Sequence, residues 1–141
     1  MKVSDILKAK GNNVYAITSS SSVYDALKTM AEKNIGALMV IEQEKLIGIF
    51  SERDYARKIV LQGKASHDTQ VSEIMTKNVL TVLSEDSLEH CMSLMSKNKV
   101  RHLPVVDNEK VAGIISISDV VTAIIESQQE TIKYLEQYIA Q

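Results

Sequence analysis

The sequence has no tryptophan, one proline and one cysteine in 141 residues. A single cysteine excludes an internal disulfide framework and favours a reducing, cytoplasmic location. No apolar run approaches the length of about 20 residues that a membrane-spanning helix needs, and the first residues lack the apolar segment of a signal peptide. The net charge of −2 shows no basic excess of the kind that binds nucleic acid. We therefore expect a cytoplasmic protein with neither a membrane nor a nucleic acid as partner.

Residue patterns for catalysis are missing as well. His67, His90 and His102 do not have the spacing of metal ligands. The sequence contains no glycine-rich phosphate loop, nucleophile elbow or paired set of catalytic acids. Cys91 falls on the apolar stripe of a predicted helix, which predicts a position in the core. We therefore expect no enzymatic activity, no catalytic residue, no catalytic cofactor and no bound metal.

What the sequence does contain is an internal repeat. Gly48–Asp54 returns 65 positions later as Gly113–Asp119, and in each copy a Ser at the end of an apolar run is followed three residues later by an Asp. At this offset the likeness extends from Val14–Tyr55 to Val79–Val120, with 12 identical positions among 42. Unrelated segments share roughly one position in twenty to one in fifteen. The chain therefore consists of two copies of one structural unit.

The hydrophobic pattern within each copy predicts strand, helix, strand, strand and helix. Ser22 with Asp25 fits a capping box before a helix, and in the second copy Asp86 or Ser87 caps the equivalent helix. The remaining predicted elements are a strand at 14–17, a turn at 11–13, a hairpin of 35–41 and 46–50 around a four-residue turn, its repeat at 100–106 and 111–115, a helix from Asp54 to near Gly63, and a last helix from Asp119 to Ile139.

The predicted domain ranges are 1–63 and 71–126, with a polar linker at 64–70 and a helical extension at 127–141. The extension has no equivalent in the first copy. One stripe of the last helix is apolar or amide-bearing along its length and consists of Val121, Ile124, Gln128, Ile132, Leu135 and Ile139. An apolar stripe on a helix needs a partner surface.

The ordered and doubled motifs resemble a stand-alone pair of cystathionine-β-synthase (CBS) domains of the small bacterial type. The matching segments are Val3–Leu7 with Val71–Thr76, the capped helices, 35–40 with 100–105, and the Ser51–Asp54 and Ser116–Asp119 endings. The chain departs from the family where a Pro often follows the first strand: Ser19 and Ser84 stand there, which predicts a looser loop.

The resemblance implies an α+β fold of the α/β type, with two βαββα units related by a pseudo-two-fold axis. In such a pair the sheets pack together and the helices lie outside. It also implies a regulatory module whose clefts between the two domains bind adenosine-containing ligands such as AMP, ADP, ATP, NAD or S-adenosylmethionine. Two pairs commonly form a flat homodimer. The resemblance does not identify the partner protein that such a module would regulate.

The resemblance gives Asp54 and Asp119 the role of accepting hydrogen bonds from the ribose 2′- and 3′-hydroxyls. A carboxylate has two acceptor oxygens that suit two neighbouring donors. The alternative is that each Asp is only a helix N-cap.

Ser51, Ser116 and Ser118 lie where a phosphate could meet a helix N-terminus, although a serine there can also cap its own helix. Arg53 and Arg57 could pair with phosphate as forked donors, or they could be solvated surface residues.

The two copies differ most near the expected pocket, where Arg101 and His102 replace Gly36 and Ala37. We therefore expect two inequivalent sites. The other candidate ligand contacts are the apolar walls Ile35, Gly36, Ala37, Val100, Leu103 and Pro104, together with Thr81 and its counterpart Ala16 after the first strands. Most of these strand residues would also be core.

Three alternatives follow from the same residues. The first is an adenine-nucleotide sensor that acts through a partner protein or through its own homodimer. The second is a scaffold protein with vestigial clefts, and the third is an S-adenosylmethionine sensor. A small enzyme is a further alternative, and the missing set of catalytic residues argues against it. The intact Ser–Asp pair in both copies argues against vestigial clefts.

Overall fold

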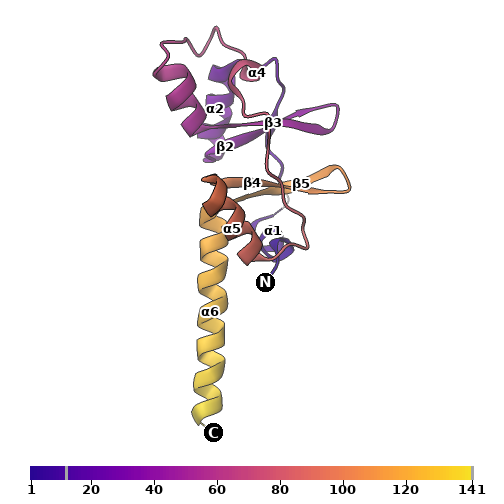
Figure 1. Cartoon of the computed structure of the whole chain (residues 1–141), viewed down its shortest axis with the longest axis vertical. Coiled ribbons are helices and arrows are strands. Elements are labelled where there is room, and N and C mark those ends of the chain that lie inside the picture. The colour runs from indigo at the N-terminus through magenta and orange to yellow at the C-terminus, as the bar shows by residue number, and fades with distance from the viewer. Residues whose placement is uncertain (12, 141) are drawn as a thin grey trace. The chain divides into compact units, whose positions relative to one another are not determined.

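Twelve helices and strands follow one another in the part of the chain that the structure describes. The computed structural model describes residues 1–11 and 13–140. The elements are α1 (Val3–Lys10), β1 (Ala16–Ile17), α2 (Val23–Lys33), β2 (Ala37–Glu42), β3 (Lys45–Ser51), α3 (Glu52–Asp54), η1 (Tyr55–Val60), α4 (Val71–Ile74), α5 (Leu88–Asn98), β4 (His102–Asp107), β5 (Lys110–Ser116) and α6 (Ile117–Ala140) (Figure 1). The turn expected at 11–13 includes Asn12, which lies outside the described residues.

The contacts divide the chain into two units. Unit 1 consists of Met1–Asn13, Thr81–Asp107 and Ala112–Gln141, and unit 2 consists of Val14–Leu80 and Asn108–Val111. Helix α1 therefore groups with the second repeat, and α4 groups with the first. The expected domain ranges follow the repeat along the chain, and they assign α1 to the first domain and α4 to the second. These ranges stay a prediction.

Unit 2 contains a three-stranded sheet in the order β1–β2–β3. Strand β1 pairs with β2 in parallel, with Ala16 opposite Met39, and β2 pairs with β3 in antiparallel. Its core consists of fully or nearly fully buried apolar side chains: Val23, Ala26, Met30, Leu38, Val40, Phe50, Ile59, Val71 and Ile74. Strand β3 of this sheet ends at Ser51, which is the first residue of the motif that carries Asp54.

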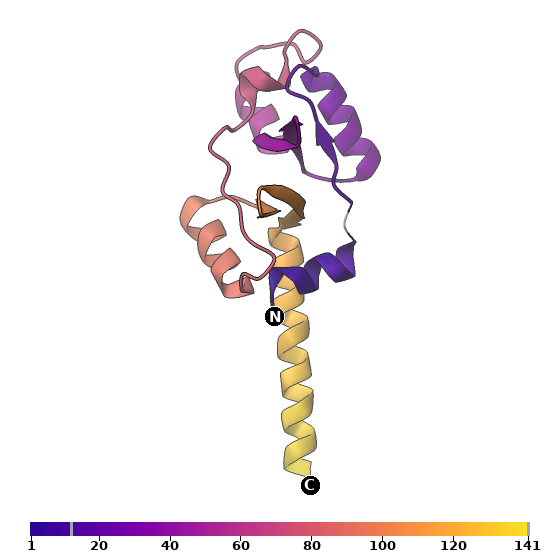
Figure 2. The same cartoon turned by 90° about the vertical axis from the view of Figure 1, so that its right-hand side faces the viewer.

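Unit 1 repeats this arrangement with fewer strand residues. Strands β4 and β5 form a two-stranded sheet, and Val82 makes one parallel bridge to Val105, where the first repeat has Ile17 beside Val40. Helices α1 and α5 both pack against α6 (Figure 2). The strand expected at the start of the second repeat is thus reduced to a single bridge.

Both hairpins turn through two residues with positive φ. Gln43 and Glu44 have φ of 50° and 67°, and Asn108 and Glu109 have φ of 49° and 66°. Positive φ at both central positions is the geometry of the type I′ turn, whose twist matches that of the flanking strands. The four-residue turn expected at 42–45 is present, with its two outer residues already in the strands.

The loops after the first strands are tied to the sheet by side chains. Ser19 donates from its backbone N and its Oγ to Glu42 Oε1, at 2.7 and 2.8 Å. In the second repeat, Ser84 donates from the same two atoms to Asp107. The expectation of a looser loop at these serines is therefore wrong, because each serine supplies two hydrogen bonds to an acid at the end of the neighbouring strand.

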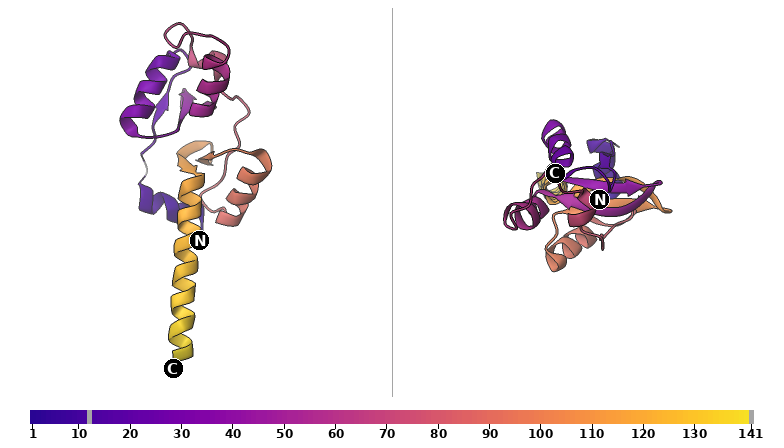
Figure 3. Two further views of the ribbon diagram at one scale, coloured as in Figure 1. Left: turned by 90° about the vertical axis from the view of Figure 1, so that its left-hand side faces the viewer. Right: turned by 90° about the horizontal axis from the view of Figure 1, so that it is seen from above.

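Helix α6 continues beyond its packing partners. Figures 1 and 3 show its C-terminal half running past α1 and α5, the other helices of unit 1. Val120 and Ala123 are buried near its start, whereas every described residue from Gln128 onward is exposed. Within the described residues, no helix is long and apolar enough to cross a membrane.

Candidate functional site

Asp54 is held by a closed set of hydrogen bonds at the end of β3. Ser51 is the N-cap of α3, and its Oγ accepts a hydrogen bond from Asp54 N at 3.2 Å. In return, Asp54 Oδ2 accepts from Ser51 N at 3.0 Å and from Ser51 Oγ at 3.1 Å. The expectation that Asp54 itself begins the helix is wrong, because Ser51 caps it and Asp54 occupies the third helical position.

The second repeat builds the same arrangement at the start of α6. Ser116 Oγ accepts from Asp119 N at 3.1 Å, and Asp119 Oδ2 accepts from Ser116 N at 2.8 Å. Asp119 is likewise the third residue of its helix rather than the first. Each Ser–Asp pair therefore fixes one carboxylate oxygen to the backbone. The other oxygen, Oδ1, accepts no hydrogen bond from the serine in either repeat.

The helix after Asp54 differs from expectation in its winding. The three residues of α3 continue as a six-residue π-helical segment, η1, in which Leu61 N donates to Ala56 O at 3.1 Å. Such segments are rare and are often found at functional sites. Lys58 lies in this segment, and its Nζ is 3.1 Å from Asp54 Oδ1.

A lysine contacts the carboxylate in both repeats, and sequence reasoning missed both lysines. Lys58 Nζ also donates to Ile74 O at 2.9 Å, and Thr76 Oγ1 lies 3.4 Å from Asp54 Oδ1. In unit 1, Lys10 Nζ lies 2.8 Å from Asp119 Oδ2 and 3.0 Å from Ile114 O. The four-residue spacing from Asp54 could have identified Lys58, whereas no local signal links Lys10 to Asp119.

Unit 1 gathers positive charge around its carboxylate. Burial acts to raise the pKa of Asp119, but the hydrogen bonds from Lys10 and Ser116 outweigh it, so the pKa lies below its ordinary value. His102 begins β4, and burial, followed by the nearby charge of Lys10, lowers its pKa, with Arg101 adding to this and Asp119 opposing it. The site in unit 1 therefore combines an ionised carboxylate with a neutral, half-buried imidazole.

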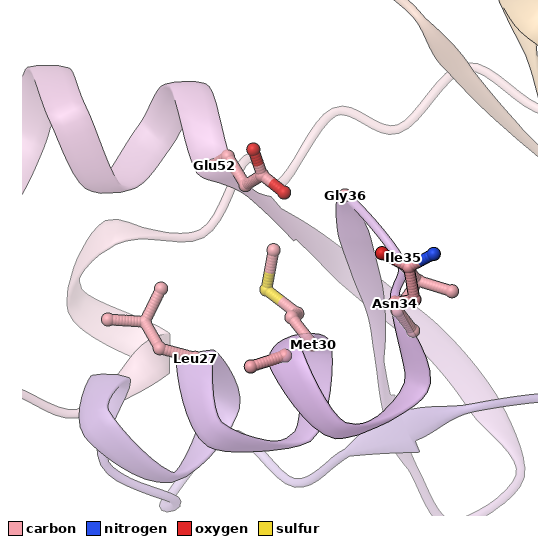
Figure 4. Close-up of a pocket in the computed structure, with 7 residues that line it drawn as sticks. Leu27, Met30, Asn34, Ile35, Gly36 and Glu52 are labelled. Atoms are coloured by element: carbon pink, nitrogen blue, oxygen red, sulfur yellow. The ribbon is translucent and has the colours of Figure 1, made fainter.

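Unit 2 has a pocket next to its motif. The pocket has a volume of about 330 Å³ and is lined by Leu27, Met30, Ala31, Asn34, Ile35, Gly36 and Glu52. Figure 4 shows the Met30 side chain directed from α2 towards Glu52. Glu52 N donates to Gly36 O at 3.1 Å, which joins the start of α3 to the residues before β2. Two predicted wall residues, Ile35 and Gly36, thus meet Glu52, which the sequence did not single out.

The other candidate residues have different exposures. Ala37, Leu103 and Pro104 are buried in strands, and Val100 is half-buried before β4. The exposed candidates are Ala16, Arg53, Arg57, Thr81, Arg101 and Ser118. Within unit 1, Ile117 N donates to Arg101 O at 2.8 Å, repeating the Glu52–Gly36 bond. Among the described residues no group of three or more His, Cys, Asp or Glu side chains is arranged to hold a metal ion.

Known proteins are similar to this chain in sequence and in fold. A protein of Arabidopsis thaliana, named CBS domain-containing protein CBSX3, mitochondrial, is 40% identical over 146 residues, which cover 97% of this chain and 71% of that protein. A solved CBS-domain protein from Burkholderia ambifaria is 48% identical, with a TM-score of 0.87 over 91% of this chain and 96% of its own.

The CBS domain pair of protein MJ0100 was solved in complex with 5′-methylthioadenosine and S-adenosyl-L-methionine. It is 30% identical to this chain, with a TM-score of 0.80 over 90% of this chain and 98% of its own. The family model of the CBS domain matches residues 3–61 and 71–126. The mixed α and β elements, the repeated Ser–Asp motif and these matches agree, and the chain therefore belongs to the CBS domain family, as a tandem pair of CBS domains.

Proposed function

We propose that this chain is a regulatory module that binds adenosine-containing ligands, namely AMP, ADP, ATP or NAD. The observation that carries the proposal is the carboxylate held in the same hydrogen-bonded geometry in both units, by Ser51 at Asp54 and by Ser116 at Asp119. A carboxylate that is fixed by its own backbone is prepared to receive a pair of hydroxyl donors, because little conformational freedom is lost on binding. The ribose of the ligand supplies that pair.

The remaining contacts divide by chemistry. Hydroxyls and cations face the phosphates, and apolar side chains face the adenine. The proposed contact residues are Ala16, Ile35, Gly36, Ala37, Ser51, Arg53, Asp54, Arg57, Thr81, Val100, Arg101, His102, Leu103, Pro104, Ser116, Ser118 and Asp119. The pocket that contains Ile35 and Gly36 supports the adenine assignment in unit 2.

S-adenosylmethionine is the second candidate ligand. The MJ0100 pair was solved with S-adenosyl-L-methionine and 5′-methylthioadenosine, and both contain the same adenosine. The ribose contacts proposed here serve either class of ligand. The difference lies in the group attached to the ribose 5′ carbon, which is a phosphate in one class and a sulfur in the other.

A ligand screen on the full chain tests the proposal. After bound ligand has been removed by unfolding and refolding, thermal shift is measured with AMP, ADP, ATP, NAD and S-adenosylmethionine. A ligand at a hundred times its dissociation constant stabilises the folded state by about 2.7 kcal/mol. The absence of any shift with all five compounds would favour the scaffold alternative.

Substitution of the two carboxylates tests the ribose contact. Asp54→Ala and Asp119→Ala should each weaken one site by about 1.5–3 kcal/mol and leave the other nearly intact. Asp86→Ala is the matched control, because Asp86 accepts from Leu83 N at 2.8 Å in a turn outside the motif. If the variant with both substitutions binds the ligand as tightly as the wild type, Asp54 and Asp119 only cap their helices.

We also propose that the module signals as a homodimer and acts on a separate regulated protein rather than by catalysis. The relatives are named for their domains or for signal transduction. The dimer is supported by exposed apolar residues on α6, among them Ile132 and Leu135, which are 54% and 49% exposed. A cytoplasmic location stays a prediction, and the Arabidopsis relative carries a mitochondrial name.

A further inference from the structure

Each motif carboxylate already has a cation in contact with it. Lys58 Nζ lies 3.1 Å from Asp54 Oδ1, and Lys10 Nζ lies 2.8 Å from Asp119 Oδ2. Each ammonium group also donates to a main-chain oxygen, Lys58 to Ile74 O at 2.9 Å and Lys10 to Ile114 O at 3.0 Å. Both ammonium groups are therefore anchored at two points, one of which does not depend on the carboxylate.

The two lysines are not products of the repeat. The position equivalent to Lys58 is the buried Ala123 of α6, and Lys10 lies on α1, before the aligned region begins. One lysine comes from the helix that follows the motif and the other from a helix 109 positions away in sequence. Lysines from two unrelated positions in the sequence thus place an ammonium group in contact with the motif carboxylate of each unit.

We propose that Lys10 and Lys58 are specificity-determining residues that select adenosine ligands bearing a 5′ phosphate over those bearing a neutral or cationic sulfur. The proposal rests on the adenosine-binding function proposed above. It names the ligand class by its charge: an adenosine phosphate, and neither 5′-methylthioadenosine nor S-adenosylmethionine.

The physical reason is competition for the carboxylate oxygens. In unit 2, Asp54 Oδ2 accepts from Ser51, and Oδ1 contacts both Lys58 and Thr76. A ribose that donates two hydroxyls must share Oδ1 with the ammonium group or displace it. A displaced ammonium group stays beside the ribose, because Ile74 O still accepts its hydrogen bond.

The retained positive charge acts differently on the three ligands. It attracts a phosphate dianion and repels the sulfonium of S-adenosylmethionine, whereas uncharged 5′-methylthioadenosine is nearly unaffected. In unit 1, Arg101 places a second positive charge near His102, and this charge acts on the ligands in the same direction as that of Lys10. The lysine side chains are 38% and 40% exposed, so solvent screens part of the effect. We expect a contribution of roughly five- to tenfold in affinity at each site.

Calorimetric titration of the full chain with AMP, 5′-methylthioadenosine and S-adenosylmethionine tests this selection. The variants are Lys10→Met, Lys58→Met and the double variant, with Lys8→Met on the exposed side of α1 as the matched control. Each lysine variant should lose roughly five- to tenfold in AMP affinity at one site. Its affinity for 5′-methylthioadenosine should not fall, because the ribose no longer competes with an ammonium group for the carboxylate, and this retained binding also shows that the site is still folded.

Two further measurements keep the inference testable if a methionine variant is unstable. Lys10→Arg and Lys58→Arg should retain the preference for AMP, because the charge remains. In the wild type, the ratio of AMP to 5′-methylthioadenosine affinity should fall as ionic strength rises from about 0.05 to 0.5 M.

The outcomes separate this inference from the function on which it rests. If adenosine ligands bind but the double variant keeps the wild-type ratio of AMP to 5′-methylthioadenosine affinity, the lysines are structural ion pairs and the inference is overturned. A wild type that binds S-adenosylmethionine more tightly than AMP would overturn it equally. If none of these compounds, and none of ADP, ATP and NAD, binds the wild type, the proposed function itself fails.

Discussion

At the scale of single residues, the environment of His102 differs from that of an ordinary surface histidine. The pKa of its imidazole is lowered, first by burial and then by the charge of Lys10. The unfolded chain therefore takes up a proton near pH 6.5, whereas the folded chain resists protonation until the pH is lower. This histidine contributes stability that is fully present above pH 6.5 and is lost as the pH falls from 6.5 through the lower pKa of the folded state.

We accordingly expect the free energy of unfolding to decline as the pH falls below about 6.5, and His102→Gln to flatten that decline. Urea denaturation at a series of pH values measures it. His90→Gln is the control, because His90 is an exposed histidine of α5 in the same unit. Equal slopes for the wild type and His102→Gln would show that the burial of His102 has no effect on stability.

At the scale of elements, two glycines decide how closely a helix segment approaches a strand. A methyl group added at Gly48 in β3 would lie 2.5 Å from Met75 Sδ and 3.1 Å from Thr76 O. The same group at Gly113 in β5 would lie 2.8 Å from one methyl carbon of Leu7. Backbone must therefore move in the first case, whereas a side-chain rotation suffices in the second.

Gly48→Ala should destabilise the fold by about 1–3 kcal/mol, the range for overpacking of a close contact. Gly113→Ala serves as its matched partner and should cost less, because only the end of the Leu7 side chain has to give way. Chemical denaturation of both variants provides the comparison. A larger loss for Gly113→Ala would contradict the backbone argument.

At the scale of the whole molecule, the exposed stripe of α6 is the feature that most needs a partner. The structure corrects the expected stripe at one position: Ile124 is half-buried beside the face that carries Val120 and Ala123, and Ile125 is 48% exposed instead. The exposed stripe is Val121, Ile125, Gln128, Ile132, Leu135 and Ile139. Its spacing alternates between four and three residues, which is the heptad pattern of a coiled coil.

A second copy of the same helix suits this stripe. Ile125, Ile132 and Ile139 share one heptad position, and Val121, Gln128 and Leu135 share the other. Ile at the first position with Leu at the second, as at Ile132 and Leu135, favours two parallel strands. The flanking positions bring no like charges together, because Glu136 would face Thr131 of the other copy in a parallel pair. The ligand could then alter how two copies associate, provided that it binds one association state more tightly than the other.

We expect light scattering at micromolar concentration to give a mass near twice 15.7 kDa. Leu135→Glu should raise the dimer dissociation constant by at least tenfold, because it places a charge in the seam. Tyr134→Glu adds the same charge one residue away, off the stripe, and should leave the dimer intact. A monomeric wild type, with and without nucleotide, would remove the dimer from the proposal.

The sequence by itself determined the features that depend on neighbours a few residues apart. The repeat, the helix caps at Ser22 and Ser87 and the hairpins were all predictable, whereas the start of the helix after β3 was placed too late, at Asp54. The reason is that a cap or a tight turn is closed by hydrogen bonds spanning three residues, so the residue types at that spacing specify the geometry.

Only the tertiary structure decided which distant segments meet. It placed Leu7 of the opening helix against Gly113 and Met75 against Gly48, so that each unit combines residues of both repeats. It also brought Lys10 to Asp119 across 109 positions and turned Ile125 rather than Ile124 outward. Such contacts depend on which complementary surfaces bury each other, and the local pattern of one segment does not contain that information.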